Sequence, residues 1–265
     1  MTPAADTLKE CCGRLAAVDL EAVIALAGLQ TRIDRKYLVP HTVLVDLLRR
    51  LEERLWVLDI QGRRTFDYES VYFDTPDLLA YHQHAHGRRR RFKVRTRTYL
   101  NSEETVLEVK TEGGRAQTVK HRTPYTMPDR YRLNARAQDV LSEELPTGIA
   151  DLRTSLISRY QRATLLDPAT GSRVTCDVGL TFQDHQRTLP GPADQVLLES
   201  KTTGPAAPVD TLLWRMGHRP VALSKYCVGL ALLNPHLPAN RWNRTLRRGF
   251  GWAPAKPTVI APSGT

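Results

Sequence analysis

Apolar and charged residues alternate along several short stretches of this chain, and the alternation predicts its strands. In the stretch from Arg88 to Tyr99, cations occupy every second position from residue 89 to residue 97. Side chains on a strand point alternately to opposite faces, so one face of this stretch is a row of cations. The same alternation marks residues 31–39, 69–74, 105–112, 117–122, 158–166, 173–182 and 196–201. An antiparallel sheet is therefore the expected centre of the fold.

Apolar residues at helical spacing predict helices around these strands. The expected helices are one or two in residues 7–29, one at 42–55, a short one before His82, and others at 134–145, 209–216 and 224–233. Beyond residue 234, prolines, glycines and four arginines predict a poorly ordered basic tail. We therefore expect an N-terminal helical segment at 1–30, one domain at 31–233 and a tail at 234–265.

The charged strand faces could lie on either side of the sheet. The strand candidates that pair an apolar face with a charged one hold Lys36, Arg95, Lys110, Arg173 and Glu199. With the apolar faces inward, the cations would form an ordinary solvated surface. The helices also need an apolar surface, however, and the outside of a barrel would provide it. The charges would then line the inside, where unit charges ~4 Å apart repel by about 4 kcal/mol at an effective dielectric of about 20, so a bound anion would be required.

Composition agrees with a soluble protein that binds an anion. The 265 residues are 41% hydrophobic and 25% charged, and 38 Lys and Arg against 28 Asp and Glu give a net charge of +10. Nucleic acid, an anionic membrane and phosphorylated small molecules all suit this charge. The four cysteines lack CxxC spacing, which fits a reducing compartment rather than a zinc site or a disulfide framework. No apolar run approaches the ~20 residues of a spanning helix, so a cytoplasmic location is expected.

Six short motifs, taken in order, resemble those of a known family. They are Ile33–Leu38 (IDRKYL), Ser70–Thr75 (SVYFDT), Lys93–Tyr99 (KVRTRTY), Leu107–Lys110 (LEVK), Leu198–Lys201 (LESK) and Ser224–Tyr226 (SKY). Together they resemble the VTC domain, a polyphosphate-polymerase-like branch of the CYTH-like triphosphate tunnel metalloenzymes. The resemblance implies an α+β fold, in which an eight-stranded antiparallel β-barrel forms a tunnel with helices packed outside. Such a tunnel binds a triphosphate and a divalent metal, here Mn²⁺ or Mg²⁺.

The resemblance also implies roles for individual residues. The residues that look like phosphate ligands are Lys36, Arg95, Arg97, Lys110, Arg162, Arg173 and Lys225. Ser224 would add a hydroxyl or a helix N-terminal amide, and Glu199 looks like the metal-binding glutamate. Strand alternation points Lys201 and Glu108 the same way, as a further phosphate ligand and a further metal ligand, and Asp177 is another carboxylate candidate. The residues expected to act in catalysis are Arg95, Arg97, Lys110 and Glu199.

The activity implied is polyphosphate synthesis from ATP by metal-assisted phosphoryl transfer, in which the end of the growing chain is the acceptor. Water as acceptor would instead make the protein a triphosphatase, and loss of turnover would leave an anion-binding module. A membrane-protein partner is compatible with the family. A nucleic-acid binder, suggested by Arg88–Arg91 and the basic tail, is disfavoured because no binding motif and no interleaved aromatic residues accompany these cations.

Overall fold

The structure is a computed structural model that describes residues 2–27, 33–112, 118–146 and 149–255. Its strands are β1 (Ala16–Val18), β2 (Ile33–Pro40), β3 (Trp56–Leu58), β4 (Phe66–Asp74), β5 (Arg91–Tyr99), β6 (Glu104–Glu112), β7 (Thr118–Tyr125), β8 (Arg153–Asp167), β9 (Ser172–Gln183), β10 (Thr188–Pro190) and β11 (Gln195–Thr202). Its helices are α1 (Pro3–Arg14), α2 (Leu20–Ala27), α3 (His41–Arg50), α4 (Leu79–Ala85), α5 (Ala135–Glu144), α6 (Pro208–Arg215), α7 (Lys225–Leu233), the 3-10 turn η1 (Asn240–Trp242) and α8 (Asn243–Phe250). Within the described residues, no helix has the length and apolar content needed to cross a bilayer.

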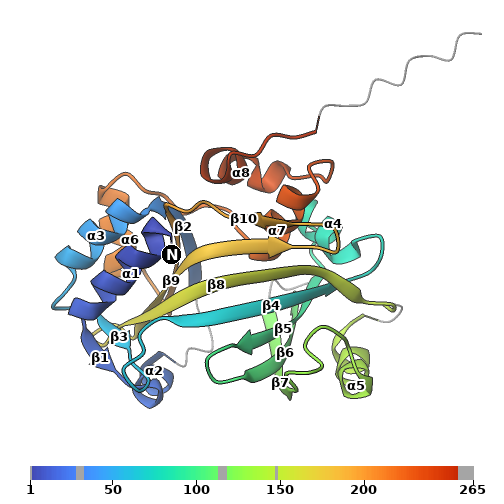
Figure 1. The fold of residues 1–265 in the computed structure, drawn as a ribbon, viewed down its shortest axis with the longest axis horizontal. Coiled ribbons are helices and arrows are strands. Elements are labelled where there is room, and N and C mark those ends of the chain that lie inside the picture. Colours follow the sequence, from blue (N-terminus) through green and yellow to red (C-terminus); the bar gives the residue numbers. More distant parts are fainter. Residues whose placement is uncertain (1, 28–32, 113–117, 147–148, 256–265) are drawn as a thin grey trace, which may run out of the picture.

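Eight strands form one antiparallel path in the order β2-β11-β9-β8-β4-β5-β6-β7, and the three short strands attach to it (Figure 1). The path bends back on itself. Lys36 on β2 lies close enough to Lys93 of β5 and Lys110 of β6, near the other end of the strand order, for its charge to add to burial in lowering the pKa of both lysines. The predicted α+β fold with an eight-stranded antiparallel β-barrel is confirmed as a barrel-like antiparallel sheet. Within the described residues, β2 and β7 are not joined by hydrogen bonds, so the sheet is curved but not closed.

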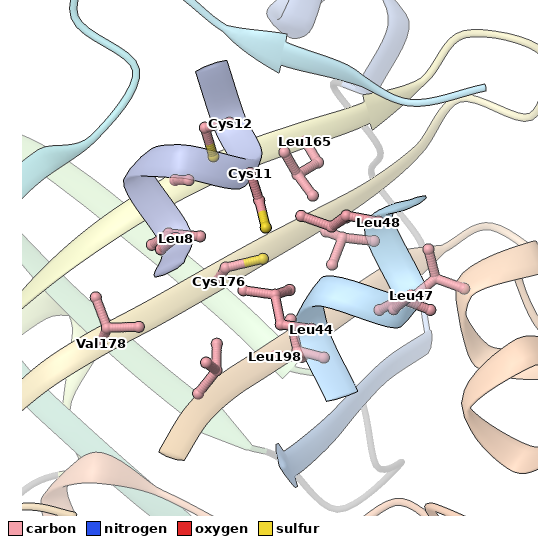
Figure 2. Packing of buried hydrophobic residues seen from close by; sticks show 14 of the residues in the cluster. Leu8, Cys11, Cys12, Leu44, Leu47, Leu48, Leu165, Cys176, Val178 and Leu198 are labelled. Atoms are coloured by element: carbon pink, nitrogen blue, oxygen red, sulfur yellow. The ribbon is translucent and has the colours of Figure 1, made fainter. Parts of the chain in front are cut away.

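Helices α1, α3, α5 and α6 cover the convex face of the sheet, as the family resemblance implied, but the helix expected at 224–233 does not. Figure 2 shows one such layer, where Leu8 of α1 and Leu44 of α3 pack against Cys176 and Val178 of β9. A second layer buries Val94 of β5 and its neighbours under α4 and α5. Alternate residues of each strand are therefore buried on this outer side, which leaves the charged positions to the concave face.

Helix α7 lies on the concave face instead, at one end of the sheet. Tyr226 of α7 stacks on Tyr72, at 5.1 Å between ring centroids, and Tyr72 shares a face with Arg95 opposite it in the sheet. Close packing here requires Gly229, because a Cβ on this residue would come within 2.5 Å of the Phe182 ring. The helix thus fills one end of the concavity.

The segment after residue 234 is ordered where the sequence predicted a poorly ordered tail. Residues 240–250 form η1 and α8, and Trp242, Leu246 and Trp252 are buried in the same cluster as α7. The Trp252 indole also donates a hydrogen bond to the carbonyl of Ala231 at 3.0 Å. Burial of the indole rings of Trp242 and Trp252 provides apolar contacts that hold this segment in place, which its arginine-rich composition did not predict. Residues 256–265 of the expected tail lie outside the described residues.

Candidate active site

Strand β5 sets the character of the concave face. Its residues alternate between partial exposure and burial along the whole strand. Phe92 and Val94 are buried on the convex side, whereas the side chains of Arg95 and Arg97 are 23% and 13% exposed on the concave side. The cationic row read from the sequence therefore faces the hollow of the sheet.

The carboxylate of Glu108 on β6 lies at the centre of this row and is 3% exposed. It accepts hydrogen bonds from Arg95 Nε and from Lys120 Nζ, both at 2.7 Å. The guanidinium groups of Arg97 and Arg122 lie 3.6 and 4.0 Å away. Burial by itself would raise the pKa of Glu108, but Arg95 and Lys120 outweigh it and lower this pKa to about 2. Both carboxylate oxygens are therefore held by cations.

A second buried carboxylate, Asp177 on β9, organises the adjoining part of the face. It accepts hydrogen bonds from Arg162 at 2.6 and 2.8 Å and pairs with Lys225 at the start of α7. Arg162 and Lys225 also lie over the ring of Tyr160. Burial opposes ionisation of Asp177, yet Arg162 and Lys225 lower its pKa. This ion pair holds the first residue of α7 against the sheet.

Glu199 on β11 forms a third centre. Its Oε1 atom lies 3.0 Å from Lys36 Nζ on β2 and 2.7 Å from Lys201 Nζ, and Lys201 also contacts Asp34 at 3.2 Å. Burial would raise the pKa of Glu199, but Lys36 and Lys201 bring it well below its usual value. The carboxylate is thus ionised, and its side chain keeps 16% exposure toward the hollow.

Cations remain in excess around these three carboxylates. Burial, together with the charges of Lys110 and Lys36, lowers the pKa of Lys93 to about 8. Burial lowers the pKa of Lys110 as well, and these two lysines lie directly opposite each other on β5 and β6. Arg173 lies opposite Lys201 in the sheet. The face therefore carries positive charge that its own carboxylates do not neutralise.

Several buried polar atoms on the concave face have no hydrogen-bond partner among the described residues. They are Arg97 Nε and the hydroxyls of Ser70, Ser158 and Thr175. Ser70 lies opposite both Arg97 and Ser158 in the sheet, and Thr175 lies opposite Glu199, so all four share one face. Unpartnered buried donors are costly and rare in folded proteins. Their concentration here indicates a place for a polar ligand.

Helix α7 is fixed to this face by a buried aspartate. Asp74, at the end of β4, accepts hydrogen bonds from the backbone amides of Ala80 and Tyr81 at 2.8 and 2.9 Å, and from the hydroxyl of Tyr226. The hydroxyl of Ser224 accepts from the amide of residue 227 and begins the helix. Ser224 therefore acts as the helix cap, and its expected contact with phosphate stays a prediction.

The sequence-predicted residues thus come together from β2, β5, β6, β8, β9, β11 and α7. Sequence reasoning gave no role to Lys120, although its alternation with Arg122 had placed both on one face. It also missed Asp74, whose helix-capping role depends on contacts between separate elements. Within the described residues, no group of three or more His, Cys, Asp or Glu side chains could hold a metal by itself.

A curved antiparallel sheet with a concave face lined by cations is thus the setting of the candidate site. The chain belongs to the VTC domain family, whose match covers residues 31–234, and the resemblance seen in its motifs is confirmed. No curated protein sequence matches the chain significantly.

Solved structures similar to the chain share little sequence with it. A provisionally assigned adenylate cyclase from Bacillus halodurans is 14% identical, with a TM-score of 0.47 over 73% of this chain and 94% of the other. A provisionally assigned adenylyl cyclase from Hippeastrum, described as having a dominant triphosphatase activity, is 15% identical, with a TM-score of 0.47 over 75% and 95% of the two chains. The PH1012 protein of Pyrococcus horikoshii is 13% identical, with a TM-score of 0.36 over 71% and 90%.

Proposed function

We propose that this protein catalyses metal-dependent phosphoryl transfer on a triphosphate held against the concave face, and that the reaction is polyphosphate synthesis from ATP. Membership of the VTC domain family supports the reaction class. The observation that carries the proposal is the coincidence, on one face, of excess cations with the unpartnered donors of Arg97, Ser70, Ser158 and Thr175. A triphosphate supplies both the negative charge and the acceptor oxygens that this face lacks.

The positions of the cations support the proposed phosphate-binding roles. Arg95 and Arg97 of β5 both lie next to Glu108, at the centre of the concave face. Lys36 and Lys201 lie next to Glu199 on the opposite wall, formed by β2 and β11. The proposed phosphate ligands are Lys36, Arg95, Arg97, Lys110, Arg162, Arg173, Lys201 and Lys225, with Ser224 supporting Lys225 as the helix cap. Phosphoryl transfer asks for positioning and for stabilisation of developing charge, so the chain needs no covalent nucleophile.

The metal proposed for this site is Mn²⁺ or Mg²⁺. Mg²⁺ is commonly held by one or two carboxylates together with substrate phosphate oxygens, which suits a site with a single available carboxylate. Glu199 fits this role, because its carboxylate is ionised and partly exposed to the hollow. Glu108 fits less well, because Arg95 and Lys120 already bind both of its oxygens. When bound, the metal would neutralise charge on the phosphates.

Hydrolysis is a second candidate function, and one observation favours it. Helix α7 packs on the concave face between Tyr72 and Phe182 and fills one end of the hollow. A growing chain would have to leave past this helix, whereas orthophosphate released by attack of water would leave easily. The acceptor, water or a phosphate chain, therefore decides between a triphosphatase and a polymerase.

Product analysis tests the proposal. Incubation with ATP and Mn²⁺ or Mg²⁺ should yield phosphate chains longer than triphosphate on a gel, and Arg95→Ala should lower kcat by about 10²–10³-fold, as expected when one electrostatic group is lost. Glu199→Ala should lower activity and shift its metal dependence. Arg136→Ala, an exposed arginine on α5, is the control and should leave activity unchanged. Orthophosphate without polymer would assign hydrolysis, and intact ATP under both metals would overturn the enzymatic proposal.

A further inference from the structure

Seven exposed arginines gather near the α7 end of the sheet and have no role in the site described above. They are Arg88, Arg89 and Arg90 before β5, and Arg241, Arg244, Arg247 and Arg248 in η1 and α8. We call this set the arginine surface. Within the described part of the chain, none of these guanidinium groups forms an ion pair, unlike Arg91 next to them, which pairs with Glu112. In Figure 1, α4, α7 and α8 lie in the upper half of the view.

The two parts of the arginine surface are in contact. The guanidinium of Arg241 lies so close to Gly87 that a Cβ on this glycine would be 2.6 Å from Nη1, and Gly87 has a positive φ of 65°. Glycine adopts this positive φ without strain. Arg241 of η1, which leads directly into α8, is thereby in contact with the segment that leads through Arg88–Arg90 into β5.

The arginine surface is also continuous with the concave face. Arg91, the first residue of β5, donates a hydrogen bond to the carbonyl of Arg88 at 2.8 Å and begins the cationic row that includes Lys93. Burial raises the pKa of the Cys227 thiol on α7, whereas the charges of both Lys93 and Arg241 oppose this rise, so both cations lie near the thiol. Positive charge therefore extends from the hollow, past the start of α7, to the outer surface.

The chemistry of the surface favours a flexible phosphate chain over other polyanions. An interfacial helix needs an apolar face to insert into lipid, but the apolar residues of this region, Trp242, Leu246 and Trp252, are buried. The same burial removes the aromatic platforms on which single-stranded nucleic acid stacks. None of the exposed large hydrophobic residues in the described chain belongs to this region. The arginine surface therefore offers a ligand electrostatic attraction and hydrogen bonds, but no apolar or aromatic contact.

We infer that the arginine surface binds the part of a linear polyphosphate chain that leaves the hollow beside the first turn of α7, along the cationic row of Arg91 and Lys93. This inference rests on the proposed function of the concave face. It assigns to the arginine surface the phosphate units that lie beyond those bound on the concave face. Long chains should then bind more tightly than tripolyphosphate, because they reach both sets of cations.

Binding of tripolyphosphate and of long-chain polyphosphate to three full-length variants provides the test. Two carry the substitutions Arg88→Gln/Arg89→Gln/Arg90→Gln and Arg244→Gln/Arg247→Gln/Arg248→Gln. The matched control is Lys9→Gln/Arg63→Gln/Arg136→Gln, which removes the same charge from exposed residues that form no ion pair within the described part of the chain. A thermal melt of each variant verifies that it is folded.

Each arginine variant should bind long-chain polyphosphate about tenfold more weakly and with a shallower salt dependence, because each phosphate contact contributes about 0.7 to the salt slope for a single-stranded polyanion. Tripolyphosphate affinity should change little in all three variants, and the control should bind long chains like the wild type. Unchanged long-chain affinity, or an equal loss in the control, would overturn the inference. So would loss of binding to phosphatidylglycerol vesicles or single-stranded DNA with polyphosphate binding retained.

Tripolyphosphate binding by Arg95→Ala separates this test from that of the proposed function. If that variant binds tripolyphosphate like the wild type, the concave face is not the phosphate site and the proposed function fails. If it loses tripolyphosphate while the arginine variants keep long-chain affinity, only the inference about the arginine surface fails.

Discussion

The buried carboxylate of Glu108 gives the sharpest prediction, because four cationic side chains lie within 4.0 Å of it. Glu108→Gln keeps the size of the side chain but removes its charge, which leaves Arg95 and Lys120 without their counterion. Removing one partner of a buried pair costs about 3–5 kcal/mol. The lowering of the Glu108 pKa from 4.5 to about 2 corresponds to about 3 kcal/mol of stability on the same scale. Two independent routes therefore give a loss of about 3 kcal/mol.

The sign of the pH dependence follows from the same shift. Because the folded-state pKa lies below the unfolded value, Glu108 stabilises the fold above pH 4.5, and this contribution is lost as the pH falls toward about 2. Protonated glutamate resembles glutamine, so the difference between wild type and Glu108→Gln should shrink over this window. Glu10→Gln, which breaks an exposed pair with Arg14, is the control and should change stability little.

Urea unfolding at a series of pH values measures both effects. At pH 7, Glu108→Gln should lower the free energy of unfolding by about 3 kcal/mol, equivalent to roughly 6–12 °C in Tm for a chain of this size. Tripolyphosphate should restore stability more strongly in the variant, because it supplies the missing negative charge. A loss below 1 kcal/mol at pH 7, or a difference that does not change between pH 5 and pH 2, would refute the reasoning.

Three further predictions concern α7 and the lysines near it. Gly229→Ala should destabilise the protein by about 1–3 kcal/mol, because the added methyl would come within 2.5 Å of the Phe182 ring; urea unfolding measures this, and an unchanged midpoint would contradict the packing. Tyr226→Phe should cost about 1–3 kcal/mol by leaving Asp74 without one donor, and it should lower triphosphate affinity by loosening α7; calorimetry that finds affinity unchanged would exclude a positioning role. Triphosphate binding should take up protons at pH 8, because the pKa of Lys93 is about 8; calorimetry in buffers of different ionisation enthalpy measures the uptake, which Lys93→Gln should reduce.

The sheet and its inner face were predictable because their patterns are local. The alternation in β5 needs only a period of two, and the structure shows the same alternation of burial in Phe92 and Val94 against Arg95 and Arg97. The helices between strands likewise follow from spacing of apolar residues. Strands β1, β3 and β10 escaped prediction because three residues are too few to show a period.

The position of α7 could not be read from its sequence. Its residues are apolar on all sides, from Tyr226 to Leu233, so no single face identifies the surface it packs against. The ion-pair partners were equally hidden, because pairing of Glu108 with Lys120 depends on the register of β6 against β7. Contacts of this kind are fixed by the tertiary fold rather than by spacing along the chain.

The chemical reactivity of the four buried cysteines can be used to measure local opening of the structure. Cys11 and Cys12 of α1 lie in one buried cluster with Cys176 of β9 on the convex side (Figure 2), whereas Cys227 of α7 is buried on the concave side. Burial raises the pKa of Cys12 to about 12, and it also raises those of Cys176 and Cys227, so each thiol is protected both sterically and by protonation. Alkylation rates of single-cysteine variants would therefore measure separately the detachment of α1 from the convex face and of α7 from the concave face.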